Sequence, residues 1–255
     1  MIYFIGAGPG ASDLITVRGS RLLGQADCII YAGSLVNPAL LGLAKPDCTI
    51  YNSAEMTLEQ VLSVFREMER NGKMTVRLHT GDQSIYGAVR EQMDALDQDG
   101  IRYESVPGVS SFFGAAAALN AEYTLPGISQ TVIITRMEGR TKVPEKEQLA
   151  KLAAHGSTMV LFLSASLTEE VQAELLRGAY TEETPAAIVF KATWPEEKIL
   201  HCTVGTLAKT AKENGIKNTA LLLIGDFLKG PAAEYERSKL YDPAFTTAFR
   251  EGESK

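Results

Sequence analysis

The sequence predicts an α/β fold with two domains, a mainly parallel sheet in the N-terminal domain and a mixed sheet in the C-terminal domain. Short apolar strands alternate with helical segments through the first 120 residues, a pattern typical of a parallel sheet covered by helices. The alternation lapses at residues 121–130, where Pro126 and Gly127 indicate a linker. Two later apolar runs flank a short turn around Trp194, which indicates a β-hairpin and therefore antiparallel pairing. The expected domains are residues 1–120 and 131–230, followed by a polar tail at 231–255.

The elements of the first domain follow from apolar spacing. In the clearest helix, residues 57–71, apolar side chains recur at helical intervals from Leu58 to Met68, and Asn71-Gly72 is a typical stop. Strands are expected at residues 2–5, 28–31, 74–78 and 101–106. Helices are expected at residues 16–25, 57–71 and 86–97 and through 115–118.

The second domain shows the same two periodicities in a less regular order. Strands are expected at residues 131–135, 159–163, 186–190, 198–203 and 220–224. Helices are expected at residues 147–154, 169–176 and 206–213. The adjacent strands at 186–190 and 198–203 have too short a connection for a parallel crossover, so the second sheet is mixed.

Composition and charge exclude several function classes. The chain has 255 residues and a formal net charge of −6, and neither half carries a surplus of Lys and Arg. A nucleic-acid partner is therefore not expected. The apolar runs are far shorter than the roughly 20 residues of a membrane span, and the N-terminus lacks a signal-peptide pattern. Three widely spaced cysteines favour neither a disulfide framework nor a metal site. We expect a cytoplasmic protein with no membrane partner.

A glycine-rich turn follows the first strand. Gly6-Ala7-Gly8-Pro9-Gly10-Ala11 formally matches a dinucleotide-binding fingerprint, which keeps an NAD(P)-dependent oxidoreductase as an alternative. Two features disfavour it. Pro9 lacks the N–H group that a phosphate cradle uses, and the second strand ends at Tyr31 without the acid that binds ribose. A tight strand-to-helix turn that needs glycine for positive φ is the simpler interpretation.

Three further loops follow predicted strands and carry polar groups. Asp82, after the third strand, either accepts hydrogen bonds from a ligand or caps a helix. Ser110 and Ser111 have the same two interpretations. Arg136 and Arg140 suit recognition of a carboxylate, since guanidinium is a planar donor fork, but either can instead pair with Glu138.

The order of these loops is more specific than any one of them. Four segments in this order resemble the tetrapyrrole methylases: Gly6-Ala7-Gly8-Pro9-Gly10, then Thr80-Gly81-Asp82 with Tyr86-Gly87, then Val106-Pro107-Gly108-Val109-Ser110-Ser111, then Leu222–Gly225 near the end. These are class III methyltransferases that depend on S-adenosyl-L-methionine. The resemblance runs from residue 1 to about residue 250, and it implies two α/β domains and a homodimer. In this family the glycine turn is not a nucleotide fingerprint, so Pro9 is expected.

The resemblance also implies site residues. The positions that match the family's donor contacts are Pro9, Thr80, Gly81, Asp82, Ile85, Ser110, Ser111, Leu163, Ala187, Ala192 and Thr193. One departure is Gln83, where the family commonly has proline. No catalytic base and no metal ligand are assigned, because a sulfonium methyl is already activated and alignment supplies much of the rate.

Segments 31–36, 130–141 and 191–197 narrow the implied activity. It is methyl transfer to carbon 11 of precorrin-4, or of its cobalt form, in cobalamin biosynthesis. We expect Arg136, Arg140 and Lys191 to face the carboxylates of this tetrapyrrole. The alternatives are methylation of another tetrapyrrole carbon, an NAD(P)-dependent oxidoreductase and a non-catalytic tetrapyrrole carrier. Related enzymes that act on diphthamide or on RNA are a further possibility, and the acidic composition disfavours RNA.

Overall fold

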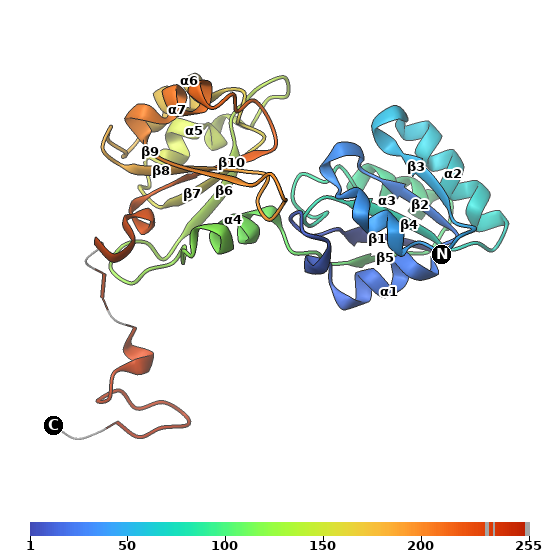
Figure 1. Ribbon diagram of the computed structural model, residues 1–255, viewed down its shortest axis with the longest axis horizontal. Helices are drawn as coiled ribbons and strands as arrows, with labels where there is room; N and C mark the ends of the chain where they lie inside the picture. Colours follow the sequence, from blue (N-terminus) through green and yellow to red (C-terminus); the bar gives the residue numbers. More distant parts are fainter. Residues whose placement is uncertain (233–234, 237, 253–255) are drawn as a thin grey trace. The chain divides into compact units, whose positions relative to one another are not determined.

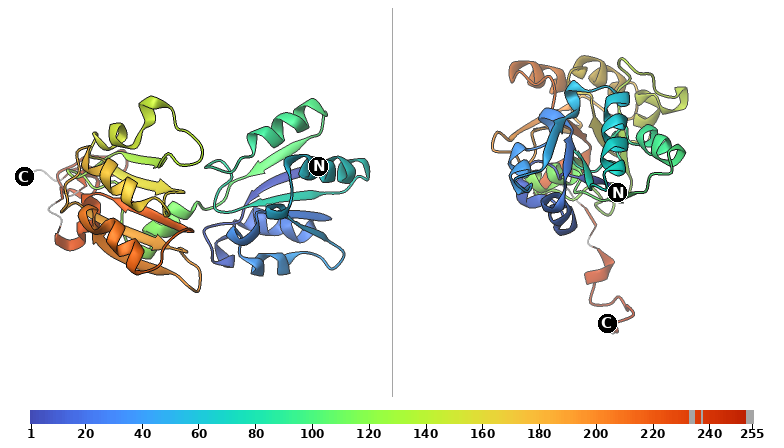
Figure 2. Two further views of the ribbon diagram at one scale, coloured as in Figure 1. Left: turned by 90° about the horizontal axis from the view of Figure 1, so that it is seen from above. Right: turned by 90° about the vertical axis from the view of Figure 1, so that its right-hand side faces the viewer.

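A computed structural model describes residues 1–232, 235–236 and 238–252 (Figures 1 and 2). The chain divides into two compact units, and each is described by itself. Unit 1 comprises Met1–Ala115 and Lys191–Glu197, and unit 2 comprises Ala116–Phe190 and Lys198–Lys255. Both units are α/β, which confirms the predicted fold class. The linker at 121–130 and the tail at 231–255 stay predictions, and residues 233–234, 237 and 253–255 of that tail lie outside the described residues.

The sheet of unit 1, predicted to be mainly parallel, is parallel at every strand pair. Its strands are β1 (Ile2–Gly6), β2 (Cys28–Tyr31), β3 (Thr49–Asn52), β4 (Thr75–His79) and β5 (Tyr103–Val106), in the order β3-β2-β4-β1-β5. Gly6 pairs with His79 of β4, and Ile5 pairs with Val106 of β5. Strand β1 lies between β4 and β5, and the C-terminal ends of the three strands lie side by side. The loops that follow these strands therefore leave the sheet at the same edge.

Helices cover both faces of this sheet, as Figure 1 shows. On one face, α1 (Val17–Gln25) packs Leu22 and Leu23 among residues of β1, β2 and β4. On the other face, α2 (Leu58–Arg70) and α3 (Arg90–Gln98) pack Phe65 and Leu96 around Phe4. Each large apolar side chain buried in this way stabilises the fold by about 1.5–3 kcal/mol. The two-faced burial explains why β1 and β2 are nearly continuous apolar runs.

Two elements of unit 1 differ from the sequence expectation. The helix expected at residues 86–97 begins only at Arg90, because Tyr86 and Ala88 have φ values of 55° and 48°, which an α-helix cannot contain. Strand β3 was not expected. It is a short edge strand whose first residues, Thr49 and Ile50, are exposed, so it lacks the apolar run that marked its neighbours.

The sheet of unit 2 is mixed, as predicted. Its strands are β6 (Val132–Arg136), β7 (Thr158–Phe162), β8 (Pro185–Phe190), β9 (Lys198–Thr203) and β10 (Ala220–Ile224), in the order β6-β7-β10-β8-β9. Only β6 and β7 are parallel neighbours, and β8 and β9 form the expected hairpin. Helix α4 (Ser111–Leu119) begins in unit 1 and ends in unit 2.

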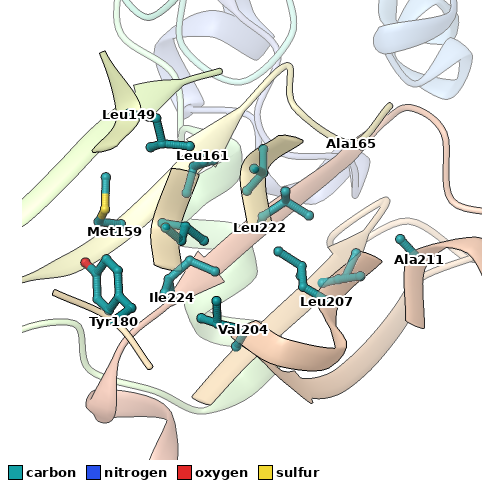
Figure 3. Packing of buried hydrophobic residues seen from close by; sticks show 14 of the residues in the cluster. Leu149, Met159, Leu161, Ala165, Tyr180, Val204, Leu207, Ala211, Leu222 and Ile224 are labelled. Atoms are coloured by element: carbon teal, nitrogen blue, oxygen red, sulfur yellow. The ribbon is translucent and has the colours of Figure 1, made fainter. Parts of the chain in front are cut away.

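One face of this sheet holds the main core of unit 2. Helices α5 (Leu149–Ala153), α6 (Thr168–Leu176) and α7 (Leu207–Glu213) pack against it. Figure 3 shows Met159 and Leu161 of β7 and Leu222 and Ile224 of β10 in one cluster with Leu149 of α5 and Leu207 of α7. Alternate residues of one strand therefore separate into this core and the opposite face, where Ala187 of β8 lies.

Short 3-10 turns connect the larger elements at Ser12–Leu14, Gly33–Leu35, Pro38–Leu43, Ser53–Glu55, Glu145–Glu147, Val204–Thr206, Asp226–Ala232 and Lys239–Tyr241. No helix in the described part of the chain is long and apolar enough to span a membrane. Among the same residues, no group of three or more His, Cys, Asp or Glu side chains is arranged to hold a metal ion.

Candidate functional site

The loops after β1, β4 and β5 touch one another through their backbones. The N–H of Gly81 donates to the carbonyl of Gly8 at 2.9 Å, and the N–H of Gly8 donates to the carbonyl of Gly81 at 3.2 Å. A Cβ atom on Gly6 would lie 2.5 Å from the Gly81 carbonyl oxygen and 2.6 Å from the Gly108 Cα. The three loops can meet only because these positions carry no side chain.

The first of these loops is a tight turn rather than a phosphate cradle. Gly8 has φ of 84°, which a residue with a side chain adopts at a cost. The chain then passes through a 3-10 turn at Ser12–Leu14, and α1 begins only at Val17. A dinucleotide turn instead leads directly into a helix N-terminus that binds pyrophosphate. The geometry therefore favours the simpler interpretation of this loop.

Asp82 joins two of the loops. Its Oδ1 accepts from the N–H of Ser84 at 2.9 Å and from the Ser84 hydroxyl, and its Oδ2 accepts from the N–H of Gly108 at 2.8 Å. Burial disfavours the charged carboxylate, but these hydrogen bonds outweigh it and lower the pKa of Asp82 below its usual 3.8. The carboxylate thus stays ionised at neutral pH and holds the loop after β4 against the loop after β5.

The other predicted donor contacts of the first domain lie in the same loops. Thr80 donates its hydroxyl to the carbonyl of Leu35, and Ile85 follows Asp82 at an intermediate exposure. Ser110 is buried, and Ser111 begins α4. A Cβ on Gly81 would lie 3.2 Å from the Ser111 nitrogen, which shows how closely these loops approach.

The segment Lys191–Glu197 belongs to unit 1 and packs on the first loop. The indole N–H of Trp194 donates to the carbonyl of Pro9 at 3.1 Å, and the N–H of Ala11 donates to the Thr193 hydroxyl at 2.9 Å. A Cβ on Gly10 would lie 2.1 Å from the Trp194 ring. Three predicted donor residues, Pro9, Ala192 and Thr193, are therefore brought together, and Trp194 fixes them.

Lys191 opens this segment. Its Nζ lies 3.5 Å from a carboxylate oxygen of Glu196 and 5.2 Å from the centre of the Trp194 ring. An ammonium group at that distance from an aromatic face is attracted to it. Lys191 is therefore held near the Trp194 side chain.

The remaining predicted site residues belong to unit 2. Leu163 directly follows β7 with φ of 53° and is 67% exposed, an unusual state for a large apolar side chain. Ala187 is buried in β8. Arg136 ends β6, and Arg140 is exposed in the loop that follows.

The guanidinium of Arg136 is engaged by its own loop. It donates to the carbonyls of Met137 at 3.3 Å, Thr141 at 3.1 Å and Lys142 at 2.9 Å. Glu138 accepts from the N–H of Val143, and within the described residues no ion pair joins it to either arginine. The alternative of a pair with Glu138 is therefore wrong for both arginines within the described residues, and for Arg136 backbone carbonyls take the place of the carboxylate.

Several polar residues around the site are buried, which was not expected from the sequence. Gln83 is 5% exposed, and its side-chain amide bonds to strands β1 and β5. Arg77 and His79 of β4 are also buried, and burial lowers the pKa of His79 to about 3. The signal that could have marked Arg77 is its position between the apolar residues Val76 and Leu78 of a buried strand. Nothing in the local pattern marks Gln83 as buried.

The charge of the three loops indicates what they can bind. Residues 6–11, 79–85 and 107–111 contain no Lys or Arg, and Asp82 is their one acidic side chain. Such loops offer backbone groups and hydroxyls, with a negative charge nearby. This suits a neutral or cationic ligand such as a sulfonium, and it suits a pyrophosphate poorly.

Fold and loops together define a two-unit α/β protein with a glycine-rich candidate site at the carboxyl edge of its parallel sheet. A sequence profile of the Tetrapyrrole (Corrin/Porphyrin) Methylases matches residues 1–208. The chain belongs to this family, which confirms the resemblance stated from its loops.

Relatives match along nearly the whole chain. A cobalt-precorrin-4 C(11)-methyltransferase of Methanocaldococcus jannaschii is 50% identical, over 100% of this chain and 97% of the relative. A precorrin-4 C(11)-methyltransferase of Sinorhizobium sp is 41% identical, over 98% of each chain.

Solved structures match the fold. A cobalt precorrin-4 methyltransferase has a TM-score of 0.87 at 49% identity, covering 89% of this chain and 95% of that one. A uroporphyrin-III C-methyltransferase from Thermus thermophilus, complexed with S-adenosylhomocysteine, has a TM-score of 0.76 at 25% identity, covering 89% and 98%.

Proposed function

We propose that this protein transfers the methyl group of S-adenosyl-L-methionine to carbon 11 of precorrin-4, with the cobalt-loaded form as the preferred acceptor, in cobalamin biosynthesis. The observation that carries the proposal is the 50% identity to a cobalt-precorrin-4 C(11)-methyltransferase along the entire chain. The preference for cobalt is supported by the lower identity, 41%, to a relative whose name gives precorrin-4 without cobalt. By resemblance to the family, we also propose that the enzyme is a cytoplasmic homodimer.

The proposed donor contacts from unit 1 are the residues of the three joined loops and of the segment packed on them. They are Pro9, Thr80, Gly81, Asp82, Ile85, Ser110, Ser111, Ala192 and Thr193. The charge of the loops supports this assignment. Asp82 is ionised and the loops contain no Lys or Arg, so they favour a ligand with a positive charge. From unit 2 we propose Leu163 and Ala187 as further donor contacts. The role of Leu163 is supported by its exposed side chain and its positive φ.

The chemistry needs little from acid–base groups. When bound, S-adenosyl-L-methionine supplies a methyl group already activated by a sulfonium. The task of the protein is to hold the donor and an electron-rich ring carbon in line, and the pre-joined glycine loops suit that task. Apolar groups such as Pro9 and Ile85 would help to exclude water from the bound donor, and no residue would be needed as a general base for the displacement itself.

We propose that Arg140 and Lys191 contact carboxylates of the tetrapyrrole, and that Arg136 supports them. Arg136 already donates three hydrogen bonds within residues 136–142, so its main effect is to shape the loop that carries Arg140. A guanidinium that faces solvent from a shaped loop keeps its donors for a substrate carboxylate.

A calorimetric titration with S-adenosylhomocysteine, with NADH as the comparison, tests the donor class. We expect saturable binding of S-adenosylhomocysteine at one site per chain and none of NADH. Binding of NADH alone by a folded sample would instead support the oxidoreductase alternative. Competition between metal-free and cobalt-loaded precorrin-4 then tests the acceptor, and equal kcat/KM values would refute the cobalt preference.

A further inference from the structure

We propose that Gln83 is a positioning residue for donor binding, because its buried carboxamide fixes the loop that carries Thr80, Gly81 and Asp82. The inference rests on the proposed function for the identity of the ligand. Gln83 stands where the family commonly has proline. In this chain, hydrogen bonds of a buried side chain take the place of the rigid proline ring.

The contacts of Gln83 reach two strands at once. Its Nε2 donates to the carbonyl of Val106 at 3.2 Å and to the carbonyl of Phe4 at 3.4 Å. Phe4 belongs to β1 and Val106 ends β5, so one side chain ties the loop after β4 to both strands whose loops it meets. This attachment acts beside the bond from Gly108 to Asp82 and reinforces the same junction.

The far end of the same loop is anchored in a similar way. The Nε2 of Gln92 donates to the carbonyl of Ala88 at 2.9 Å, and its Oε1 accepts from Nε of the buried Arg77 at 3.2 Å. Between the two glutamines, Tyr86 and Ala88 hold positive φ, and a Cβ on Gly87 would lie 2.1 Å from the Gln83 carbonyl oxygen. Backbone in such conformations persists only where its surroundings hold it.

Stability alone is a poor explanation for this carboxamide. In the described structure the Oε1 of Gln83 is buried without a hydrogen-bond partner. A half-satisfied buried amide contributes little to stability, since the cost of the unpaired acceptor offsets the two bonds made by Nε2. What the side chain does provide is a fixed position for residues 80–85.

The test compares Gln83→Leu with a matched control, Gln172→Leu. Gln172 also makes two backbone hydrogen bonds, to Gly205 and Ala208, but it lies on α6 of unit 2 and both bonds stay within that unit. Hydrogen–deuterium exchange of the ligand-free proteins gives a readout that does not depend on the donor. We expect faster exchange in residues 80–89 and 107–111 of Gln83→Leu, with a melting temperature close to wild type, and no such change in Gln172→Leu.

The second readout is donor binding. Loss of the anchor should raise the Kd for S-adenosylhomocysteine and the KM for S-adenosyl-L-methionine by about tenfold, while the KM for the tetrapyrrole stays unchanged. Gln83→Met, which keeps the length of the side chain without its donors, should behave in the same way if the leucine variant folds poorly.

Exchange in residues 80–89 at the wild-type rate, or an unchanged Kd with faster exchange, would overturn the inference. Failure of the wild-type protein to bind S-adenosylhomocysteine would contradict the proposed function, and with it the donor part of this inference. The exchange data would still show whether Gln83 anchors the loop.

Discussion

Replacement of Gly108 by alanine tests the junction of the three loops directly. A Cβ at this position would lie 2.2 Å from the Gly81 carbonyl oxygen and 2.6 Å from the Gly6 Cα. Since ordinary van der Waals contact begins near 3.4 Å, the loops after β1 and β4 would have to move by about 1 Å. Backbone atoms, not flexible side chains, form the obstacle, so the strain cannot be relieved by a change of rotamer.

The size of the effect follows from overpacking. Forcing one extra carbon into a well-packed site costs about 1–3 kcal/mol, which corresponds to a fall of roughly 2–12 °C in melting temperature for a chain of this size. Because the shift separates the proposed donor loops, we also expect affinity for S-adenosylhomocysteine to fall at least about tenfold.

Gly42→Ala is the matched control for Gly108→Ala. Gly42 has open space around its Cβ position and does not adopt positive φ, so alanine there should be neutral or slightly stabilising. Thermal denaturation followed by near-ultraviolet circular dichroism, together with calorimetric titration, measures both effects. A Gly108→Ala protein with the stability and affinity of wild type would refute the close contact of the three loops.

Three further predictions concern charged and titratable groups. Asp82→Asn should cost about 1 kcal/mol at pH 7 by weakening the bond to Gly108. Because the pKa of Asp82 is depressed in the folded state, the stability advantage of wild type over Asp82→Asn is present above the unfolded pKa of about 3.8. It is lost as pH falls through the lower folded pKa. Denaturation curves at pH 7 and below pH 3 measure this difference in stability, and a difference that does not change with pH would contradict the prediction. The pKa of His79 is lowered to about 3, so wild type should lose stability as pH falls from 6.5 toward 3, and His79→Phe should lose less; parallel curves for the two proteins would show that burial does not hold His79 neutral. Arg140→Ala should lower kcat/KM for the tetrapyrrole about tenfold and leave the Kd for S-adenosylhomocysteine unchanged, as steady-state kinetics and calorimetry can establish; unchanged kcat/KM would remove Arg140 from the substrate site.

The strands and most helices could be predicted because their signals are local. Helix α2 begins after Thr57, whose hydroxyl and Gln60 form a capping box, and it ends at the expected Asn71-Gly72. Strands β2, β9 and β10 match their expected bounds. In each case the apolar spacing and the flanking residues suffice, and tertiary contacts add nothing that contradicts them.

The start of α3 could not be predicted, because a tertiary effect overrides the local pattern. Tyr86 and Val89 continue the apolar spacing of the helix, yet the chain before Arg90 is held in left-handed conformations between Gln83 and Gln92. Strand β3 could not be predicted for a different reason. Its pairing with β2 is fixed by the sheet, while its own residues are half exposed.

The site was predictable as a set of loops but not as a junction. Strand-end positions placed Gly8, Gly81 and Gly108 at one edge of a parallel sheet, and the resemblance added their order. That β1 lies between β4 and β5 cannot be read from one sequence, and the contacts of Gly6 depend on it. The sequence alone also cannot show that the guanidinium of Arg136 donates its hydrogen bonds to carbonyls of its own loop.

Transfer of a labelled methyl group is the direct test of methylation at carbon 11. The protein would be incubated with S-adenosyl-L-methionine carrying ¹³C in its methyl group and with cobalt-precorrin-4, and the product examined by NMR. We predict a single labelled methyl group on carbon 11 and stoichiometric S-adenosylhomocysteine. A label on a different ring carbon, or no transfer by a folded protein that binds S-adenosylhomocysteine, would contradict the assignment.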